Sequence, residues 1–170
     1  MARVIILGAN GSGKSTVGHE LANLLNCAHF DTENYWFHKT ETPYTVSRPP
    51  EERNAMFISD IKKHDSYVVS GSVSEWDEAF LKLFDLAVFL EVPTNVRVER
   101  IEKREHERFR DRIKENGDMY EQHLRFIGYA KLRDIPLLKK KAGKYSCPII
   151  YFDGTKNYKD IAKKIKERIL

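Results

Sequence analysis

Residues 3–16 read RVIILGANGSGKST, and the part from Gly8 to Ser15 fits the pattern G-x-x-x-x-G-K-[ST] in full. The apolar run before the pattern indicates a strand, and the stretch after it indicates a helix, which is the context that the pattern requires. Glycines let the backbone turn tightly and bring its N–H groups against phosphate oxygens with no side chain between them. The sequence therefore predicts a nucleotide-binding loop formed by Gly8, Ala9, Asn10, Gly11, Ser12, Gly13, Lys14, Ser15 and Thr16.

Two side chains of this loop add chemistry to its shape. Lys14 places a positive charge between the outer phosphates, and the Ser15 hydroxyl is suited to ligate Mg²⁺. The positive end of the helix that begins near Lys14 adds to the attraction for an anion. No N-K-x-D element that would read a guanine base follows in the sequence, and its absence favours ATP over GTP.

Length and composition limit the architecture. The chain has 170 residues, of which 41% are hydrophobic and 32% charged, and this predicts one compact domain over residues 1–170. No apolar run approaches the ~20 residues of a membrane span or has the form of a secretory signal, so we expect a soluble, cytoplasmic protein. Cys27 and Cys147 lie far apart without metal-ligand spacing and are expected to be reduced thiols. The net charge of +4 suits an anionic ligand but falls short of a nucleic-acid footprint.

Short apolar runs alternate with longer amphipathic stretches along the chain, a pattern typical of a parallel sheet covered by helices on both faces. The predicted strands are residues 3–7, 28–30, 67–70, 86–92 and 149–152. The predicted helices are residues 15–25, 50–64, 75–84, 94–108, 118–141 and 158–169, with Thr94 as an N-cap and Pro136 kinking or splitting the fifth. The loop over residues 39–49 is long for such a unit, and loops of this kind often serve ligands.

These motifs and the order of the elements resemble the small P-loop kinases typified by adenylate, shikimate and gluconate kinases. The resemblance covers essentially the whole chain in element order. It implies a three-layer P-loop NTPase fold whose five parallel strands run in the order 2-3-1-4-5. It also implies a monomer that transfers the γ-phosphoryl group of ATP, with Mg²⁺, to a small-molecule acceptor beneath a short arginine-bearing lid.

The ends of the second and third strands carry the residues that the resemblance assigns to the acceptor. Asp31 and Glu33 resemble the D-[ST]-D element of shikimate kinase, in which the first acid helps to hold Mg²⁺ and accepts the proton of the acceptor's hydroxyl. Gly71 stands where these kinases approach the acceptor with backbone. The alternatives are a strand end in solvent and a plain strand-to-helix turn. No arginine follows Gly71 as it does in adenylate kinase, and this disfavours AMP as the acceptor.

Aromatic residues follow the second predicted strand. Tyr35, Trp36 and Phe37 are suited either to one wall of an acceptor pocket or to the core, and the core is the more frequent place for aromatics beside a strand. Arg48 and Arg53 could meet an anionic group on the acceptor.

Four arginines recur at three- and four-residue spacing in the helix predicted after the fourth strand, and they share one face. They are Arg97, Arg100, Arg104 and Arg108. An exposed, salt-bridged helix would show the same spacing. The run from 100 to 104 resembles the R-[IL]-x-x-R entry to the lid of adenylate kinase, which implies that Arg100 stacks on adenine and that Arg104 contacts phosphate. Gly154 lies where this family touches adenine with backbone, although a simple turn would look the same.

The segment over about residues 105–117 is predicted to be the lid. It holds Arg108, Arg110 and Arg112 and has no zinc-binding cysteines. Phosphoryl transfer spreads negative charge over the migrating group, and guanidinium groups delivered by a mobile segment stabilise that charge. Arg112 resembles the arginine that follows the lid in adenylate kinase and is assigned to the substrate, and Arg125 loosely resembles a later one.

Three functions fit this sequence. The leading one is an ATP- and Mg²⁺-dependent kinase in which Lys14, Arg104 and Arg108 stabilise the transferring charge. Ser15 and Asp31 would hold the magnesium, and Asp31 would also be the base. The second is an ATP-binding regulator that switches a partner, such as a protein or DNA, with weak or no kinase activity. The third is a polynucleotide kinase, which the basic charge favours and the even mixing of acids with arginines disfavours.

Overall fold

The computed structural model describes residues 1–169 and contains one parallel sheet. Its strands are β1 (Arg3–Gly8), β2 (Ala28–Asp31), β3 (Tyr67–Ser70), β4 (Leu86–Glu91) and β5 (Ile149–Asp153). They lie in the order β2-β3-β1-β4-β5, and every neighbouring pair is parallel. The predicted fold class and strand order are confirmed, and each strand ends within one residue of its predicted bounds.

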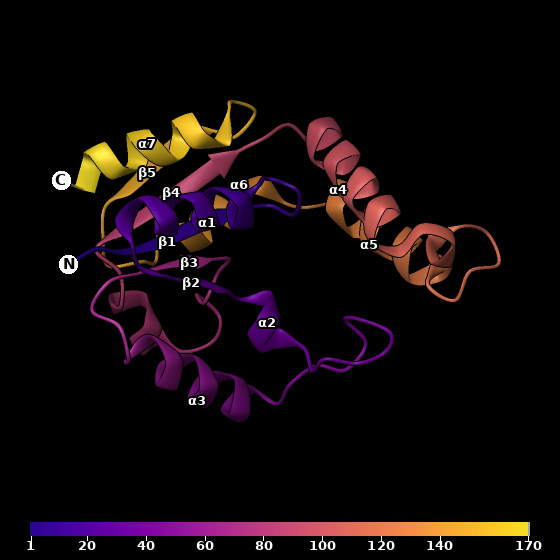
Figure 1. Ribbon diagram of the computed structural model, residues 1–170, viewed down its shortest axis with the longest axis horizontal. Coiled ribbons are helices and arrows are strands. Elements are labelled where there is room, and N and C mark those ends of the chain that lie inside the picture. Colours follow the sequence, from indigo (N-terminus) through magenta and orange to yellow (C-terminus); the bar gives the residue numbers. More distant parts are fainter. Residues whose placement is uncertain (170) are drawn as a thin grey trace.

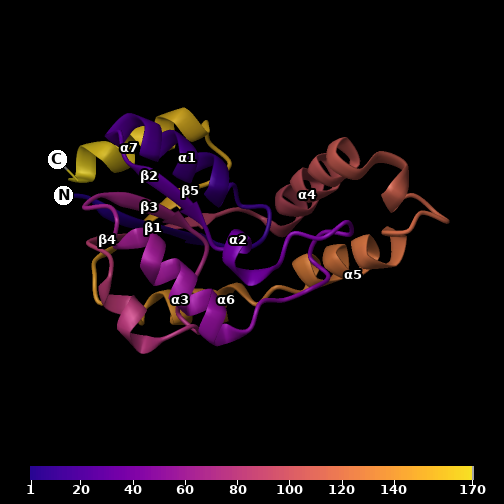
Figure 2. The ribbon, with the colours of Figure 1, turned by 60° about the horizontal axis from the view of Figure 1, so that its bottom comes forward.

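Helices cover both faces of the sheet, as Figure 2 shows with the sheet between two helical layers. Successive side chains of a strand point to opposite faces, so Val4 and Ile6 enter one apolar layer while Ile5 and Leu7 enter the other. The first face is covered by α1 (Lys14–Leu25) and α7 (Tyr158–Ile169), and the second by α3 (Pro50–Ile61), the 3₁₀ helix η1 (Glu78–Lys82) and α6 (Ile135–Ala142).

An arm built from two helices and a 3₁₀ turn extends beyond the sheet, past the end of β4 (Figure 1). Its elements are α4 (Thr94–Phe109), η2 (Arg110–Ile113) and α5 (Tyr120–Lys131). The two helices bury a small apolar cluster of their own, and the buried His123 Nδ1 is hydrogen-bonded to Glu105 Oε2 across them. The predicted lid over residues 105–117 is therefore the outer part of an arm with its own packing.

The helix predicted over residues 75–84 is wrong in type and length, because only the short η1 forms there. Asp77 is its N-cap and accepts a hydrogen bond from the Ala79 N–H at 2.8 Å, a local bond that competes with a longer helix. Phe80 and Phe84 are buried in the core, so tertiary packing holds this segment instead of a helical ladder.

The single helix predicted over residues 118–141 is two helices, α5 and α6, separated by residues 132–134. Asp134 is the N-cap of α6, and its Oδ1 accepts a hydrogen bond from the Leu137 N–H at 2.9 Å. Pro136 lies in the first turn of α6, where its missing N–H removes no helical hydrogen bond. The predicted split is confirmed, but the break lies before the proline.

Three further differences between prediction and structure concern individual helices. α3 stops at Ile61, short of the predicted residue 64. A short helix α2 (Glu33–Trp36) was not predicted. Thr94 is the first residue of α4 and not its N-cap, because its hydroxyl accepts a hydrogen bond from the Arg97 guanidinium at 3.0 Å and Pro93 precedes the helix.

Cys27 and Cys147 are free and half-buried, and burial raises the pKa of both thiols. Across residues 1–169 we find no helix with the length and apolar character needed to cross a membrane.

Candidate nucleotide and acceptor site

The loop between β1 and α1 has the backbone conformation that its glycines predict. The φ angle is 81° at Gly11 and 90° at Gly13, both in the left-handed region. A Cβ atom on Gly11 would lie 2.4 Å from the Arg97 carbonyl oxygen of α4, so only glycine fits there. The Ser12 hydroxyl is buried and has no hydrogen-bond partner within the described chain, which is unusual for a buried polar atom unless a ligand completes it.

The Lys14 side chain folds back onto this loop. Its Nζ donates a hydrogen bond to the Ala9 carbonyl at 3.1 Å. The pKa of Lys14 is lowered to about 8, chiefly by burial; the charges of Glu33 and Asp31 raise it, and those of Arg104 and Arg133 lower it by smaller amounts. The ammonium group is therefore poorly solvated at the loop, and a bound anion would stabilise its charge.

We expect nucleotide binding to depend on pH through Lys14. The ammonium is held at the loop below its pKa of about 8 and is lost above it, whereas bound phosphates raise that pKa and keep the proton in place. ATP affinity should therefore fall by roughly tenfold between about pH 7 and about pH 9, with uptake of a proton on binding at the upper end.

Calorimetry in two buffers of different ionisation enthalpy measures both effects. The Lys14→Arg variant is the control, because a guanidinium stays charged over this range and should bind ATP with no such decline. An unchanged affinity across these pH values in the wild type would contradict the prediction.

Ser15, Asp31 and Glu33 lie together where α1 begins and β2 ends. The Ser15 hydroxyl donates to Asp31 Oδ2, and the Glu33 N–H donates to Asp31 Oδ1 at 3.0 Å. Magnesium in phosphate-transfer sites is held by one or two protein oxygens together with phosphate oxygens and water. The Ser15 hydroxyl and the Asp31 carboxylate match that donor set. Within residues 1–169 there is no cluster of three or more His, Cys, Asp or Glu that could hold a metal ion without a ligand's help.

The end of β3 contacts the end of β2 through glycine. The φ angle of Gly71 is 109°, and its N–H donates to the Ile6 carbonyl of β1 at 2.9 Å. A Cβ atom on Gly71 would lie 1.9 Å from Thr32 Oγ1. The predicted acceptor residues Asp31 and Gly71 are thus brought to neighbouring strand ends, with Thr32 between them.

We expect Gly71→Ala to destabilise the protein by at least ~2 kcal/mol, because alanine is strained at this φ angle and its Cβ collides with Thr32. The matched control is Gly128→Ala in α5, where a Cβ atom meets nothing within 4 Å. That change should stabilise the protein by ~0.5–1 kcal/mol through helix propensity. Urea denaturation of both variants measures the difference, and equal midpoints would contradict the expectation.

Arg100 joins the phosphate loop to the turn after β5. Its Nη2 donates to the Gly154 carbonyl at 3.0 Å, and its Nη1 lies 3.5 Å from the Ser12 carbonyl. The two residues predicted to touch adenine are therefore in contact with each other beside the loop. Thr16 is exposed on α1.

The other predicted arginines differ in their surroundings. Arg104 is half-buried, and its Nε has no hydrogen-bond partner in the described residues. Arg108 is exposed in the last turn of α4. Arg112 lies in η2 and pairs with Asp118 through three hydrogen bonds, from Nε to Oδ1 at 3.0 Å and to Oδ2 at 3.2 Å, and from Nη2 to Oδ2 at 2.7 Å. In the structure Arg112 is thus engaged with a carboxylate within the arm.

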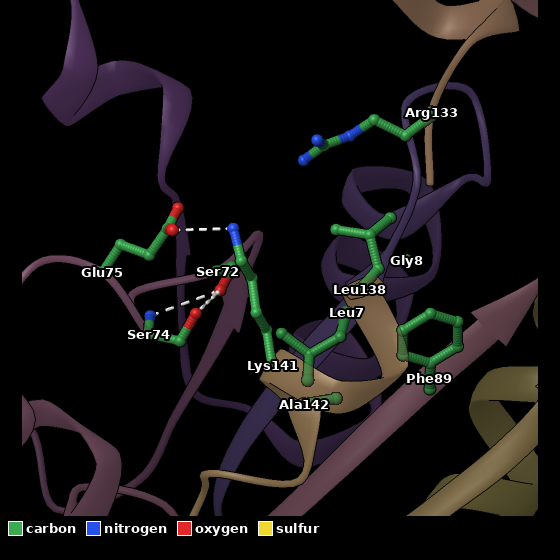
Figure 3. A pocket seen from close by; sticks show the side chains of 10 residues that line it. All are labelled: Leu7, Gly8, Ser72, Ser74, Glu75, Phe89, Arg133, Leu138, Lys141 and Ala142. Atoms are coloured by element: carbon green, nitrogen blue, oxygen red, sulfur yellow. Dashed lines mark hydrogen bonds and ion pairs between the residues drawn. The ribbon is translucent and has the colours of Figure 1, made fainter. Parts of the chain in front are cut away.

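A small cavity of about 60 Å³ beside the phosphate loop contains basic residues that were not predicted as site residues (Figure 3). Arg133 points into it from the segment between α5 and α6, and its Nε has no hydrogen-bond partner within residues 1–169. Lys141 of α6 reaches across to Glu75, with Nζ 2.6 Å from Oε1. Neither residue lies in a motif or at a helical spacing shared with the other arginines, so no sequence signal identified them.

The aromatic residues after β2 divide between core and surface. Tyr35 is buried in the core, whereas Trp36 is 38% exposed. The buried Arg53 guanidinium lies between two indole rings, 4.4 Å from the centroid of Trp36 and 4.5 Å from that of Trp76. The core reading is therefore confirmed for Tyr35, and a role of Trp36 in an acceptor pocket stays a prediction. Arg48, also considered there, is paired with Glu52 at 2.6 Å.

The long loop after α2 touches the arm. The Gln122 side chain of α5 donates to the Pro43 carbonyl at 2.9 Å, and Arg112 Nη1 lies 3.5 Å from the Glu41 carbonyl. Tyr44 has a φ angle of 64°, an uncommon conformation for a bulky residue. The loop over residues 39–49 and the arm that contains the predicted lid are thus in direct contact.

Two sequence comparisons place the chain in a family. The family model described as "AAA domain" matches residues 4–122. The uncharacterized protein YqaC of Bacillus subtilis (strain 168) is 37% identical over 130 residues, which cover 76% of this chain and 71% of that protein.

Three solved structures that are similar to this chain are kinases. A shikimate kinase from Acinetobacter baumannii, in complex with shikimate, is 21% identical with a TM-score of 0.56, and the match covers 99% of this chain and 93% of that one. A shikimate kinase from Bacteroides thetaiotaomicron is 20% identical with a TM-score of 0.57, over 99% and 98% of the two chains. A deoxyadenosine kinase from M. mycoides is 14% identical with a TM-score of 0.54, over 98% of each chain.

At these identities the likeness to solved structures concerns the fold alone. That fold is the parallel sheet with β1 at its centre, the phosphate loop after it and the helices around it. The predicted resemblance to the small P-loop kinases is confirmed at this level. Since the family model spans the phosphate loop, β4 and α4, the chain belongs to the AAA domain family of P-loop NTPases and is kinase-like in fold.

Proposed function

We propose that the protein is an ATP- and Mg²⁺-dependent phosphotransferase that moves the γ-phosphoryl group to a small-molecule acceptor. The observation that carries the proposal is the contact between Ser15 and Asp31 at the mouth of the phosphate loop. One of these side chains comes from the loop and the other from the end of β2. Their contact combines suitable oxygen ligands for a metal with a carboxylate that faces the position of an attacking hydroxyl.

The cations around the loop support a polyanionic ligand. Four of them form no ion pair with a carboxylate in residues 1–169, whereas ion pairs do form elsewhere on the chain. They are Lys14, Arg100, Arg104 and Arg133. Cations that are partly buried and form no ion pair favour a triphosphate that would pair with them.

The chemistry follows from this arrangement. The acceptor's hydroxyl oxygen forms a bond to the γ-phosphorus while the bond from that phosphorus to the β–γ bridging oxygen breaks, and ADP leaves with the electron pair. Asp31 accepts the hydroxyl proton, and its other contacts to Ser15 and Glu33 fix its direction. Lys14 and Arg104 stabilise the charge that spreads over the phosphoryl oxygens. Bound Mg²⁺ would neutralise part of that charge.

The acceptor side favours a small molecule with a hydroxyl and an anionic group. Two basic residues are candidates to bind the anionic group of the acceptor. Arg53 lies against Trp36, and Arg133 points into the cavity beside Gly8. Shikimate, which is bound in the Acinetobacter baumannii kinase, carries hydroxyls and a carboxylate and should be tested as an acceptor of this protein.

The test is an ADP-release screen over nucleoside monophosphates, shikimate, gluconate and other sugar acids, with a no-acceptor control. A true acceptor should raise turnover by ~100-fold over that control, which corresponds to about 2.7 kcal/mol of barrier. Tryptophan fluorescence gives an independent measure of acceptor binding. The chain has 2 tryptophans, and both lie against Arg53. No response to any acceptor in either measurement would contradict the proposal.

A nucleotide-switched regulator is the second candidate, and the contacts of the arm favour it. Gln122 already binds the loop over residues 39–49 at the Pro43 carbonyl, and Arg112 is paired with Asp118 instead of being free for a substrate. Such a protein would release ADP without consuming any added small molecule and would copurify with a protein or DNA. For DNA, binding should be strongest at low salt and weaken steeply as salt rises.

A further inference from the structure

Arg97 is the largest side chain that is completely buried, with an exposed fraction of 0%. A guanidinium group taken out of water normally pairs with a carboxylate, because its desolvation is strongly unfavourable. Arg97 has no such partner in residues 1–169. Every hydrogen bond it makes goes to an uncharged oxygen, so its positive charge is left uncompensated within the protein.

Those oxygens come from three separate parts of the fold. Nη1 donates to the Asn10 carbonyl of the phosphate loop at 3.0 Å and to the Ala130 carbonyl in the last turn of α5 at 3.3 Å. Nε donates to the Val92 carbonyl at 3.2 Å, in the connection between β4 and α4, and Nη2 donates to the hydroxyl of Thr94, the first residue of α4, at 3.0 Å. One rigid, planar group therefore links the loop to both helices of the arm.

The bond to Asn10 fixes the direction of the following N–H group. In a planar trans peptide the carbonyl and the next N–H point in opposite directions, so the Gly11 N–H points away from Arg97. No carbonyl or side-chain oxygen in residues 1–169 accepts a hydrogen bond from it. The Gly11 N–H is therefore an unused donor in the loop that the pattern assigns to phosphates. The hydrogen bond from Arg97 to the Asn10 carbonyl fixes its direction.

The bond to Ala130 acts on the arm. Ala130 lies three residues before Arg133, which points into the cavity beside Gly8. A guanidinium that binds both carbonyls couples the position of this cation to the shape of the phosphate loop.

We propose that Arg97 is a positioning residue for nucleotide, which aims the Gly11 N–H at the bound phosphates and ties the end of α5 to the same loop. The inference rests on the proposed function only in that the loop binds ATP. If wild type binds ATP but transfers phosphate to no acceptor, the phosphotransferase proposal fails and Arg97 is still tested through binding.

The test compares Arg97→Met and Arg97→Lys with Lys103→Met, which removes an exposed cation from the same helix. Calorimetry with ATP and Mg²⁺ should show binding ~10–100-fold weaker in Arg97→Met, as expected for loss of hydrogen bonds from a charged donor. Arg97→Lys keeps the positive charge but lacks the planar guanidinium with its several N–H donors, so it should recover part of that loss. Lys103→Met should match the wild type.

A merely structural role gives a different pattern. It would lower the unfolding midpoint and weaken ATP binding in proportion. The positioning role predicts a loss of ATP affinity that exceeds any fall in the unfolding midpoint, with backbone amides of residues 9–13 exchanging faster with deuterium in the folded Arg97→Lys variant. ATP affinity within twofold of wild type in Arg97→Met would overturn the proposal. If Arg97→Met does not fold, the same result in Arg97→Lys overturns it.

Discussion

Replacing Lys14 by alanine should lower phosphoryl-transfer turnover by at least ~10³-fold, because the charge that Lys14 places at the outer phosphates is needed most as the transition state forms. Its ammonium is held by the Ala9 carbonyl, and burial there lowers its pKa to about 8. It is therefore already at the loop and need not be brought there from solvent. Steady-state ADP release at saturating acceptor measures the loss.

The fold should survive this change. Lys14 makes no ion pair, and its removal takes a poorly compensated charge out of the loop, so circular dichroism and the unfolding midpoint should stay close to the wild type. Lys14→Arg is the companion variant, because it keeps the charge but changes its shape and should retain part of the activity. Full turnover in a folded Lys14→Ala protein would refute the assignment of the loop.

The strands of the fold could be predicted because parallel strands that are buried on both faces read as short continuous apolar runs. Val4 to Leu7 and Val68 to Val69 are such runs, and each glycine turn that follows marks a strand end. The helix predicted over residues 75–84 failed for the opposite reason. Its apolar residues satisfy a helical period, but the Asp77 cap and the burial of Phe80 decide the local structure, and neither is visible as a period.

The site divides in the same way. Contacts within one motif, such as Lys14 with Ala9, follow from local sequence, and the pairing of Ser15 with Asp31 follows from parallel strands that end at one edge. Arg97 and Arg100 share a helix face by spacing, yet one is completely buried and the other reaches Gly154. Which of these two arginines is buried depends on how α4 packs against the phosphate loop. The spacing of the arginines in the sequence does not predict it.

Replacing Asp31 by asparagine should lower turnover by ~10³-fold, which lies within the range that a positioned general base contributes. Asparagine keeps the shape and can still meet the Ser15 hydroxyl and the Glu33 N–H, so the strand end should remain in place. What it loses is the negative charge that would hold Mg²⁺ and the capacity to take a proton. Asp65→Asn, an exposed carboxylate just before β3, is the control and should leave turnover unchanged.

The two roles proposed for Asp31 are to hold Mg²⁺ and to accept the hydroxyl proton. They can be distinguished by how the turnover of Asp31→Asn depends on Mg²⁺ concentration and on pH. If the carboxylate acts only through the metal, raising Mg²⁺ should restore most of the turnover of Asp31→Asn, because a weakened site refills by mass action. If it also accepts the hydroxyl proton, turnover at saturating Mg²⁺ should stay low and should rise with pH as solvent takes over the role of base. The proposed mechanism predicts the second outcome, with Oδ2 on the side of the candidate metal ligand Ser15 and Oδ1 oriented by the Glu33 N–H. Wild-type turnover in Asp31→Asn at ordinary Mg²⁺ concentration would remove Asp31 from the mechanism altogether and leave the phosphate loop without a partner on the acceptor side.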